Sequence, residues 1–177
     1  MLFSDRSLWT MMHGIVLGGA ALMALFAALF AMRAMYPADG AGGAVDRQSR
    51  SVAQLTVLVA AILWVAVLTG TYVVFPPYRA APPPGVTDLA AYPRSMLLAN
   101  PDTAWLHAFA MESKEHMPWI ASMLATAVAF VAVRCRSTLL ADARMHRMAM
   151  ALLAICFALV SFTALMGIFV NKVAPLE

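Results

Sequence analysis

Four apolar stretches, separated by polar segments, divide the chain along most of its length. They cover about residues 8–32, 51–75, 117–133 and 148–170, and the third has a more polar lead-in that begins at 103. At a rise of about 1.5 Å per residue, helices over these stretches are long enough to cross a hydrocarbon core about 30 Å thick. The pattern therefore predicts an all-α integral membrane protein with four transmembrane helices in an up-and-down bundle.

The composition narrows this prediction further. Hydrophobic residues make up 63% of the chain and charged residues 12%, and the mean hydropathy is +0.79. Little remains outside the four stretches, so we expect one membrane domain over 1–177 and no soluble catalytic domain of the usual kinds. The length of the first stretch, with Asp5 before it and Arg33 after it, favours a retained helix over a cleaved signal peptide.

The distribution of basic residues predicts the orientation in the membrane. The connections 33–50 and 134–147 hold seven of the twelve basic residues: Arg33, Arg47, Arg50, Arg134, Arg136, Arg144 and Arg147. The positive-inside rule then places both termini and the connection 76–102 on the periplasmic side of a bacterial inner membrane. The basic residues lie at helix ends, and the net charge of +3 does not indicate a nucleic-acid partner.

The connection 76–102 is rich in proline. The run Pro82-Pro83-Pro84 favours an extended, polyproline-like path across the outer surface. Pro101 precedes two residues with capping side chains, so we expect Asp102 or Thr103 to cap the third helix. The connection is longer than a helical hairpin needs, which predicts that it covers a site or meets a partner.

The two halves of the chain show a faint internal repeat. A shift of 97 positions aligns Arg47 with Arg144 and Gly70 with Gly167. The first and third helices match less cleanly, at an offset of 101–103. If the repeat is genuine, it is a parallel repeat of two hairpins about an axis along the membrane normal. Chance similarity between apolar helices is the alternative.

Two histidines are predicted to lie at the same depth. His13 precedes Arg33 by 20 residues and His116 precedes Arg134 by 18, which corresponds to about 30 and 27 Å of helix. The repeat, at its larger offset, would place these two imidazoles across the axis from one another. His107 points about 180° away from His116 on the same helix, and His146 belongs to the opposite membrane face. The predicted pair is therefore His13 with His116.

Two facing imidazoles in a helical bundle are typical of haem ligation. Further residues complete this hypothesis: Glu112 or Glu115 as hydrogen-bond partner or proton acceptor, Trp119 against the porphyrin, and Arg79, Lys114 or Lys172 for its propionates. Gly14 begins a GxxxG pattern with Gly18 that admits another helix or a flat ligand close to the backbone.

In helix number and histidine depth the chain resembles small membrane b-type cytochrome subunits. The resemblance implies haem b between His13 and His116, and electron transfer near the outer face between a quinone and a redox partner. It implies an electron-transfer subunit of a redox complex rather than a stand-alone catalyst. No sequence motif carries the resemblance, so function has to be argued from the site.

Two alternatives remain open at this point. Met12 and Met117 flank the histidines, and thioether and imidazole groups suit copper, so the chain is alternatively a copper-handling or small-solute membrane protein. It is otherwise a cofactor-free accessory or structural subunit of a larger complex. Within the haem hypothesis, a homodimer could instead share one haem between equivalent histidines across the dimer axis.

Overall fold

The computed structural model describes residues 4–35 and 42–174, and its helices form four candidate membrane spans. The first span consists of α1 (Asp5–Met11), the π-helical segment η1 (Met12–Leu17) and α2 (Gly18–Ala34). The second consists of α3 (Gly42–Thr69), the π-helical η2 (Gly70–Val74) and α4 (Phe75–Arg79). The third consists of α6 (Pro101–Trp105), the π-helical η3 (Leu106–Met111) and α7 (Glu112–Arg134). The fourth is α9 (Ala143–Val173), and α5 (Pro93–Ala99) and α8 (Arg136–Ala141) lie in the connections.

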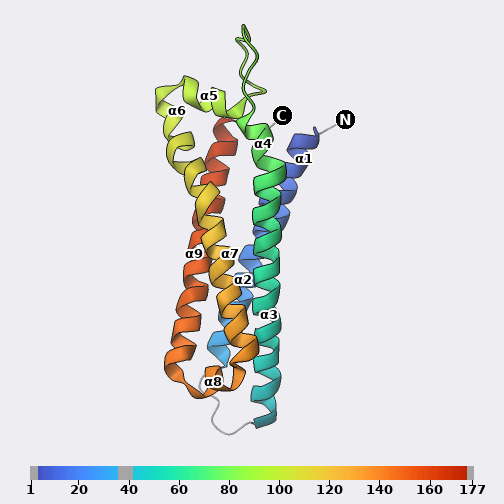
Figure 1. The fold of residues 1–177 in the computed structure, drawn as a ribbon, viewed down its shortest axis with the longest axis vertical. Helices are drawn as coiled ribbons and strands as arrows, with labels where there is room; N and C mark the ends of the chain where they lie inside the picture. Colours follow the sequence, from blue (N-terminus) through green and yellow to red (C-terminus); the bar gives the residue numbers. More distant parts are fainter. Residues whose placement is uncertain (1–3, 36–41, 175–177) are drawn as a thin grey trace.

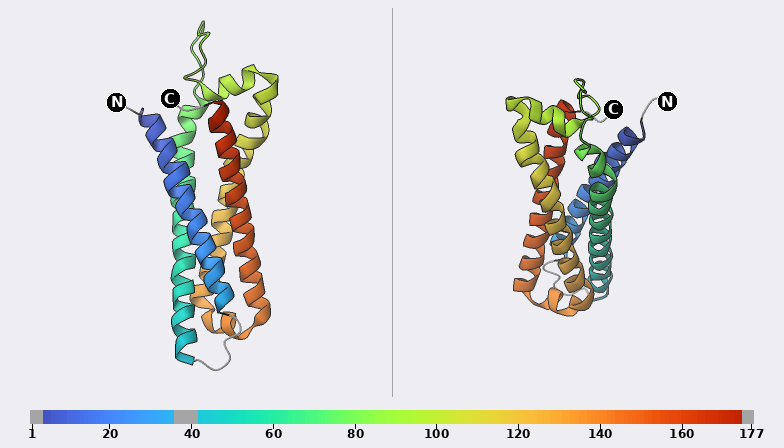
Figure 2. Two further views of the ribbon diagram at one scale, coloured as in Figure 1. Left: turned by 180° about the vertical axis from the view of Figure 1, so that it is seen from behind. Right: turned by 45° about the horizontal axis from the view of Figure 1, so that its top comes forward.

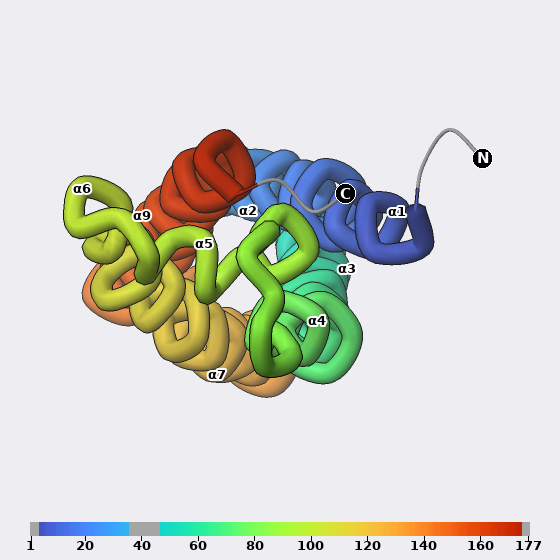
Figure 3. The backbone as a smooth tube through the Cα atoms, turned by 90° about the horizontal axis from the view of Figure 1, so that it is seen from above, coloured from blue at the N-terminus to red at the C-terminus, as the bar shows by residue number. Residues whose placement is uncertain are grey.

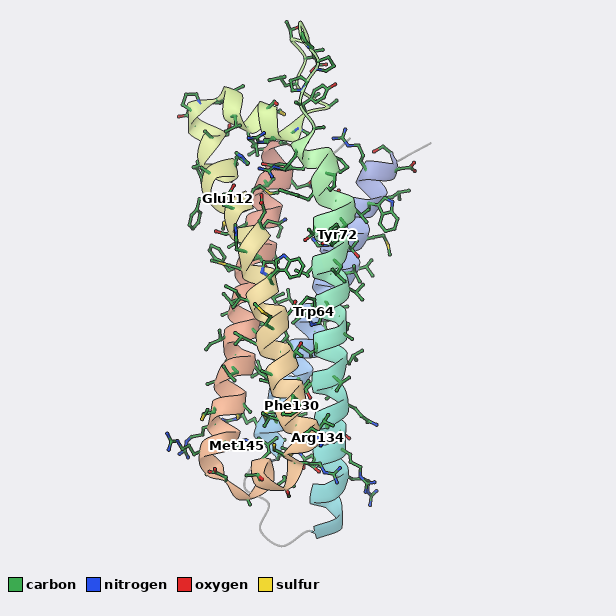
Figure 4. The ribbon with its side chains drawn as sticks, in the orientation of Figure 1. Trp64, Tyr72, Glu112, Phe130, Arg134 and Met145 are labelled. Atoms are coloured by element: carbon green, nitrogen blue, oxygen red, sulfur yellow. The ribbon has the colours of Figure 1, made fainter. Side chains whose placement is uncertain are left out.

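The spans form an up-and-down bundle, which confirms the predicted four-helix membrane fold (Figure 1). Each span packs against the next in the chain, and the fourth packs back against the first. Viewed from the end that carries both termini, the four spans follow one another clockwise (Figure 3). We call this end, with α5 and residues 80–92, the loop end. The opposite end is the arginine end, where Arg134 and Met145 lie in Figure 4.

The second span is longer than predicted. It continues to Arg79 because Pro76 and Pro77 occupy the first turn of α4, where a missing backbone N–H costs little. The non-helical part of the connection is therefore shorter than 76–102 and runs over 80–92. The predicted cap of the third span is wrong: the Asn100 side chain accepts a 2.9 Å hydrogen bond from the backbone N–H of Asp102. Pro101 occupies the first helical position, which moves the cap one residue before it.

The core of the arginine half is made largely of small and aliphatic side chains. Ala28, Ala125 and Leu153 are among its fully buried members. Small residues allow helices to approach closely, and close packing is what drives helix association in a bilayer. At the surface of the α3–α7 contact, the Trp64 indole donates a 2.9 Å hydrogen bond to Thr126 and meets Trp119 edge-on (Figure 4).

The buried residues of the two hairpins occupy matching positions when the two sequences are aligned. In the second and fourth spans they lie 97 positions apart: Val52 and Ala149, Thr56 and Leu153, Val59 and Cys156, Leu63 and Val160. In the first and third spans they lie 100 apart: Ala21 and Ala121, Leu25 and Ala125, Ala28 and Val128, Met32 and Ala132. This shared register supports a parallel repeat of two hairpins, in which diagonally opposed spans are equivalent.

Candidate functional site

A polar layer interrupts the hydrophobic core in the loop half of the bundle. The larger core cluster, toward the arginine end, extends up to Ala21, Leu63, Ala121 and Val160. A second cluster at the loop end contains Tyr78, Leu106, Met111, Met166 and Val170. Where the two clusters meet lies one residue from each span, with Gly167 next to Met166 of the second cluster. Together we call these four residues the polar layer: His13, Gly70, Lys114 and Gly167.

Each polar side chain of the layer lies on a glycine of the neighbouring span. A Cβ atom placed on Gly70 would lie 2.7 Å from Cε1 of the His13 ring and 3.1 Å from its Nε2. A Cβ atom placed on Gly167 would lie 2.7 Å from Nζ of Lys114. Both glycines therefore leave space that a polar side chain from the next helix fills.

His13 has one nitrogen with no hydrogen-bond partner. The backbone of Ala66 lies within hydrogen-bonding reach of the ring, whereas Nδ1 is buried and unpartnered. A neutral imidazole has one N–H, and with that hydrogen on Nε2 the ring presents a bare Nδ1 lone pair to the interior.

Lys114 brings a donor to the same layer. Its side chain is half-buried, its ammonium nitrogen lies at Gly167, and its charge is close enough to act on His13. Within residues 4–35 and 42–174, no hydrogen bond or ion pair holds this ammonium. An unpaired ammonium in a membrane-spanning helix is costly, and such groups commonly mark functional sites.

The internal repeat explains why these two side chains occupy equivalent positions, each on a glycine of the next span. Gly70 and Gly167 are the aligned glycines of the two hairpins, and the equivalent of His13 is Lys114, 101 residues later. Nearer the arginine end the offset between these spans is 100. The difference of one residue is accounted for by η1 in the first span, because a π-helical segment contains an inserted residue.

Three π-helical segments border the polar layer. His13 lies in η1, Gly70 begins η2, and η3 ends three residues before Lys114. Single π-helical turns inside α-helices occur frequently at functional sites, because the wider turn redirects side chains and frees backbone groups. Their position in three of the four spans supports the assignment of this level of the bundle as the candidate site.

A buried hydrogen-bonded network closes the bundle above the layer. His107 of η3 is buried, and its Nδ1 lies 3.0 Å from the hydroxyl of Tyr78. Nε of Arg94 on α5 donates a 3.2 Å hydrogen bond to Nε2 of the same ring. A guanidinium only donates, so Nε2 is bare and Nδ1–H donates to the Tyr78 oxygen. We call Tyr78, Arg94 and His107 the cap network.

We expect His107→Ala to destabilise the protein by about 1–3 kcal/mol, because it leaves buried groups of Tyr78 and Arg94 without a partner. Thermal unfolding in detergent measures the change, and faster proteolysis within 80–92 should accompany it. His116→Ala is the control: this ring is exposed, and its loss should change stability by less than about 0.5 kcal/mol. Equal stabilities of the two variants would show that the network does not hold the cap.

The two carboxylates predicted for the site differ in environment. Glu112 is exposed, whereas Glu115 is half-buried and has one buried oxygen, Oε1, without a hydrogen-bond partner. Arg79, whose guanidinium lies 5.2 Å from the centre of the Phe75 ring, is close enough to interact with the charge of Glu115. Along the third span Glu112 precedes Lys114 on the loop side and Glu115 follows it toward the arginine end. The charge of Arg94, in the cap network, also acts on Glu115.

The structure does not bring His13 and His116 together. Lys114 points into the bundle, and a residue two positions later is rotated by about 200° on a helix. His116 is accordingly exposed, and its Nδ1 lies 2.8 Å from the backbone oxygen of Glu112. A haem held between these two histidines of one chain is not supported by this geometry.

The other predicted ligands also lie apart from the layer. Trp119 packs on Trp64 at the α3–α7 surface, Met12 is exposed and Met117 half-buried. Lys172 is exposed and lines a small groove of about 220 Å³ between α6 and α9. In the described part of the chain, no three His, Cys, Asp or Glu side chains are grouped so that they could hold a metal ion.

Tyr78 and Arg94 were not among the predicted site residues, and Lys114 was predicted only as a partner for haem propionates. Lys114 had one signal in the sequence, since the lower limit of the repeat offset, 101, pairs it with His13. Tyr78 and Arg94 had none, because the fold of 80–100 decides their contact with His107. Comparisons of this chain with protein-family models, curated proteins and solved structures found no match.

Proposed function

We propose that this protein is a multi-pass membrane subunit whose polar layer binds a lipid-soluble, hydroxyl-bearing ligand of the quinol class. The observation that carries the proposal is the buried, unpartnered Nδ1 of His13 beside the Lys114 ammonium, which no hydrogen bond or ion pair holds in the described residues. Nδ1 of His13 accepts and Nζ of Lys114 donates. A ligand hydroxyl does both, so one hydroxyl can satisfy the two side chains at once.

Three properties of the site support a quinol in particular. The layer lies within the loop half of membrane-spanning helices, so its ligand has to dissolve in the bilayer. Hydrogen bonds to buried charged groups are stronger than those to neutral ones, which favours a ligand that pairs with Lys114. Each hydroxyl of a quinol can donate a hydrogen bond to an imidazole nitrogen and accept one from an ammonium. The proposal replaces the expected haem at His13 with a quinol.

Calorimetric titration of the detergent-solubilised protein with durohydroquinone, under anaerobic conditions, tests the proposal. We expect one site per chain and at least a tenfold loss of affinity in His13→Phe, which keeps a ring over Gly70 but removes the lone pair. His116→Phe is the matched control and should bind as the wild type does. No binding to the wild-type protein, or equal affinities for both variants, would overturn the proposal.

Haem or copper is the second candidate, because the bare Nδ1 of His13 is also a metal ligand. This candidate predicts a metal-dependent optical spectrum from the purified protein, with a sharp band on reduction that His13→Phe removes and His116→Phe retains. Elemental analysis of the same sample distinguishes iron from copper. A colourless, folded protein that binds durohydroquinone would reject the haem and copper candidates and support the quinol site.

We also propose that the arginine end faces the cytoplasm of a bacterial cell, following the excess of basic residues there. Cys135, at the end of α7, is half-buried, whereas Cys156 is buried and its thiol lies 3.5 Å from the backbone oxygen of Ala121. We expect a membrane-impermeant maleimide to label Cys135 in inside-out vesicles only, and Cys135→Ser to abolish this labelling. Labelling of Cys135 in right-side-out vesicles would reverse the orientation.

A further inference from the structure

The first span separates from α9 toward the loop end. α1 and η1 pack against the second span, whereas contact between the first span and α9 is made mainly by α2. The tube and ribbon views agree that α1 diverges from α9 (Figures 2 and 3). We call the space between η1 and the loop half of α9 the seam.

The other contacts between neighbouring spans are filled by rings at or near this level. His13 lies on Gly70 between the first and second spans. Trp64 meets Trp119 between the second and third, and Phe109 meets Phe162 between the third and fourth, with ring centres 5.7 and 6.1 Å apart. Among the described residues, no ring contact joins the first span to α9.

Glycines of the first span face the seam. His13 points toward the second span, and a right-handed helix running away from the loop end turns clockwise by about 100° per residue. Gly14 is therefore directed toward α9, which is the next span clockwise from that direction (Figure 3). Nothing lies within 4 Å of a Cβ atom placed on Gly14, and only the backbone oxygen of His13, at 3.6 Å, lies near one placed on Gly18.

The GxxxG pattern is thus not used for close helix packing within the chain. Nearer the arginine end, Leu22 and Leu29 pack against the core, so the contact is filled there and opens at the glycines. The other wall of the seam is α9, on which Lys114 rests at Gly167. The seam therefore lies beside Gly167, where the unpartnered ammonium of Lys114 rests.

We infer that the ligand of the polar layer has an apolar tail, which lies in the seam against Gly14 and Gly18 while its head reaches His13 and Lys114 from the bilayer. This inference rests on the proposed function and adds an entry route and a tail-binding surface. Glycines suit such a surface because an apolar chain can lie directly on the helix backbone.

Filling the seam tests the inference. Gly18→Leu places a side chain where only the protein's own backbone is near, and Leu is a better helix former than Gly, so the variant should fold. We compare two probes: durohydroquinone, which has no tail, and decylubiquinol, which has a ten-carbon tail. We expect Gly18→Leu to lower the affinity for decylubiquinol at least tenfold and to change that for durohydroquinone less than twofold. Ala27→Leu, on an exposed position of the same span, is the control and should affect neither probe.

The outcomes separate this inference from the proposed function. If the wild-type protein does not bind durohydroquinone, both the proposed function and this inference are overturned. If it binds both probes and Gly18→Leu affects them equally, or affects neither, the seam is not the tail site. If Gly18→Leu instead dissociates a dimer in nanodiscs and leaves decylubiquinol binding intact, the seam is covered by a second copy, which also overturns the inference.

Discussion

Lys114→Met will raise the thermal stability of the protein and abolish its binding of durohydroquinone. Methionine has nearly the length of lysine and fills the same space on Gly167, but it has no charge to bury. Because no partner compensates the ammonium in the described part of the chain, its removal should stabilise the fold by about 1–3 kcal/mol. For a domain of this size, that corresponds to a rise in melting temperature of about 3–10 °C.

Lys172→Met is the matched control for this prediction. Lys172 is exposed at the end of α9, so its loss should change both melting temperature and affinity little. Replacing a residue that stabilises the fold lowers the melting temperature of the protein. Replacing a residue that serves function at a cost in stability raises it. A lower melting temperature in Lys114→Met would show that the ammonium is paired in the native protein and would remove the basis of the polar layer.

Gly70→Ala will destabilise the protein and displace the His13 ring. The added methyl group would lie 2.7 Å from Cε1 of a ring that packs tightly between two helices. Overpacking of this kind costs about 1–3 kcal/mol, partly offset by the better helix propensity of alanine, so we expect a net loss of about 1–2 kcal/mol. Affinity for durohydroquinone should fall at least tenfold, because Nδ1 no longer points into the layer.

Two further glycines give graded controls. At Gly167 the nearest atom is the far end of the flexible Lys114 side chain, which can move, so Gly167→Ala should change stability by less than about 0.5 kcal/mol. At Gly19 nothing lies within 4 Å, and Gly19→Ala should stabilise the helix by about 0.5–1 kcal/mol. Chemical denaturation in detergent measures all three variants, and equal effects at Gly70 and Gly19 would contradict the packing of His13 described here.

The predicted depth of the candidate residues agrees with the structure more closely than their predicted direction. His13 and His116 both lie in the loop half of the bundle, as their distances from Arg33 and Arg134 indicate. Their directions differ, since His13 points inward and His116 outward. Rise along a helix accumulates slowly and tolerates small errors, whereas a shift of one residue rotates a side chain by about 100°.

The π-helical segments explain why the direction was not predictable. A uniform 3.6 residues per turn does not account for η1, which inserts a residue into the first span. That insertion raises the offset between the first and third spans from 100 to 101 and makes Lys114, rather than Ser113, the equivalent of His13. The predicted partner His116 lies at an offset of 103, two residues further along. Apolar periodicity gives no signal for it, because a π-helical turn is stabilised by contacts with neighbouring helices and by the polar groups it exposes.

The sequence by itself determined the number of spans, their approximate ends, the gathering of arginines at one end and the likeness of the two hairpins. These properties follow from the cost of placing charges and unpaired backbone groups in hydrocarbon, which depends on local composition alone. Only the tertiary structure decided which polar groups meet. The pairing of His13 with Lys114, the cap network and the seam depend on helix rotation and on the path of residues 80–100. Rotation and loop path are set by side-chain packing between spans distant in sequence, which local pattern does not encode.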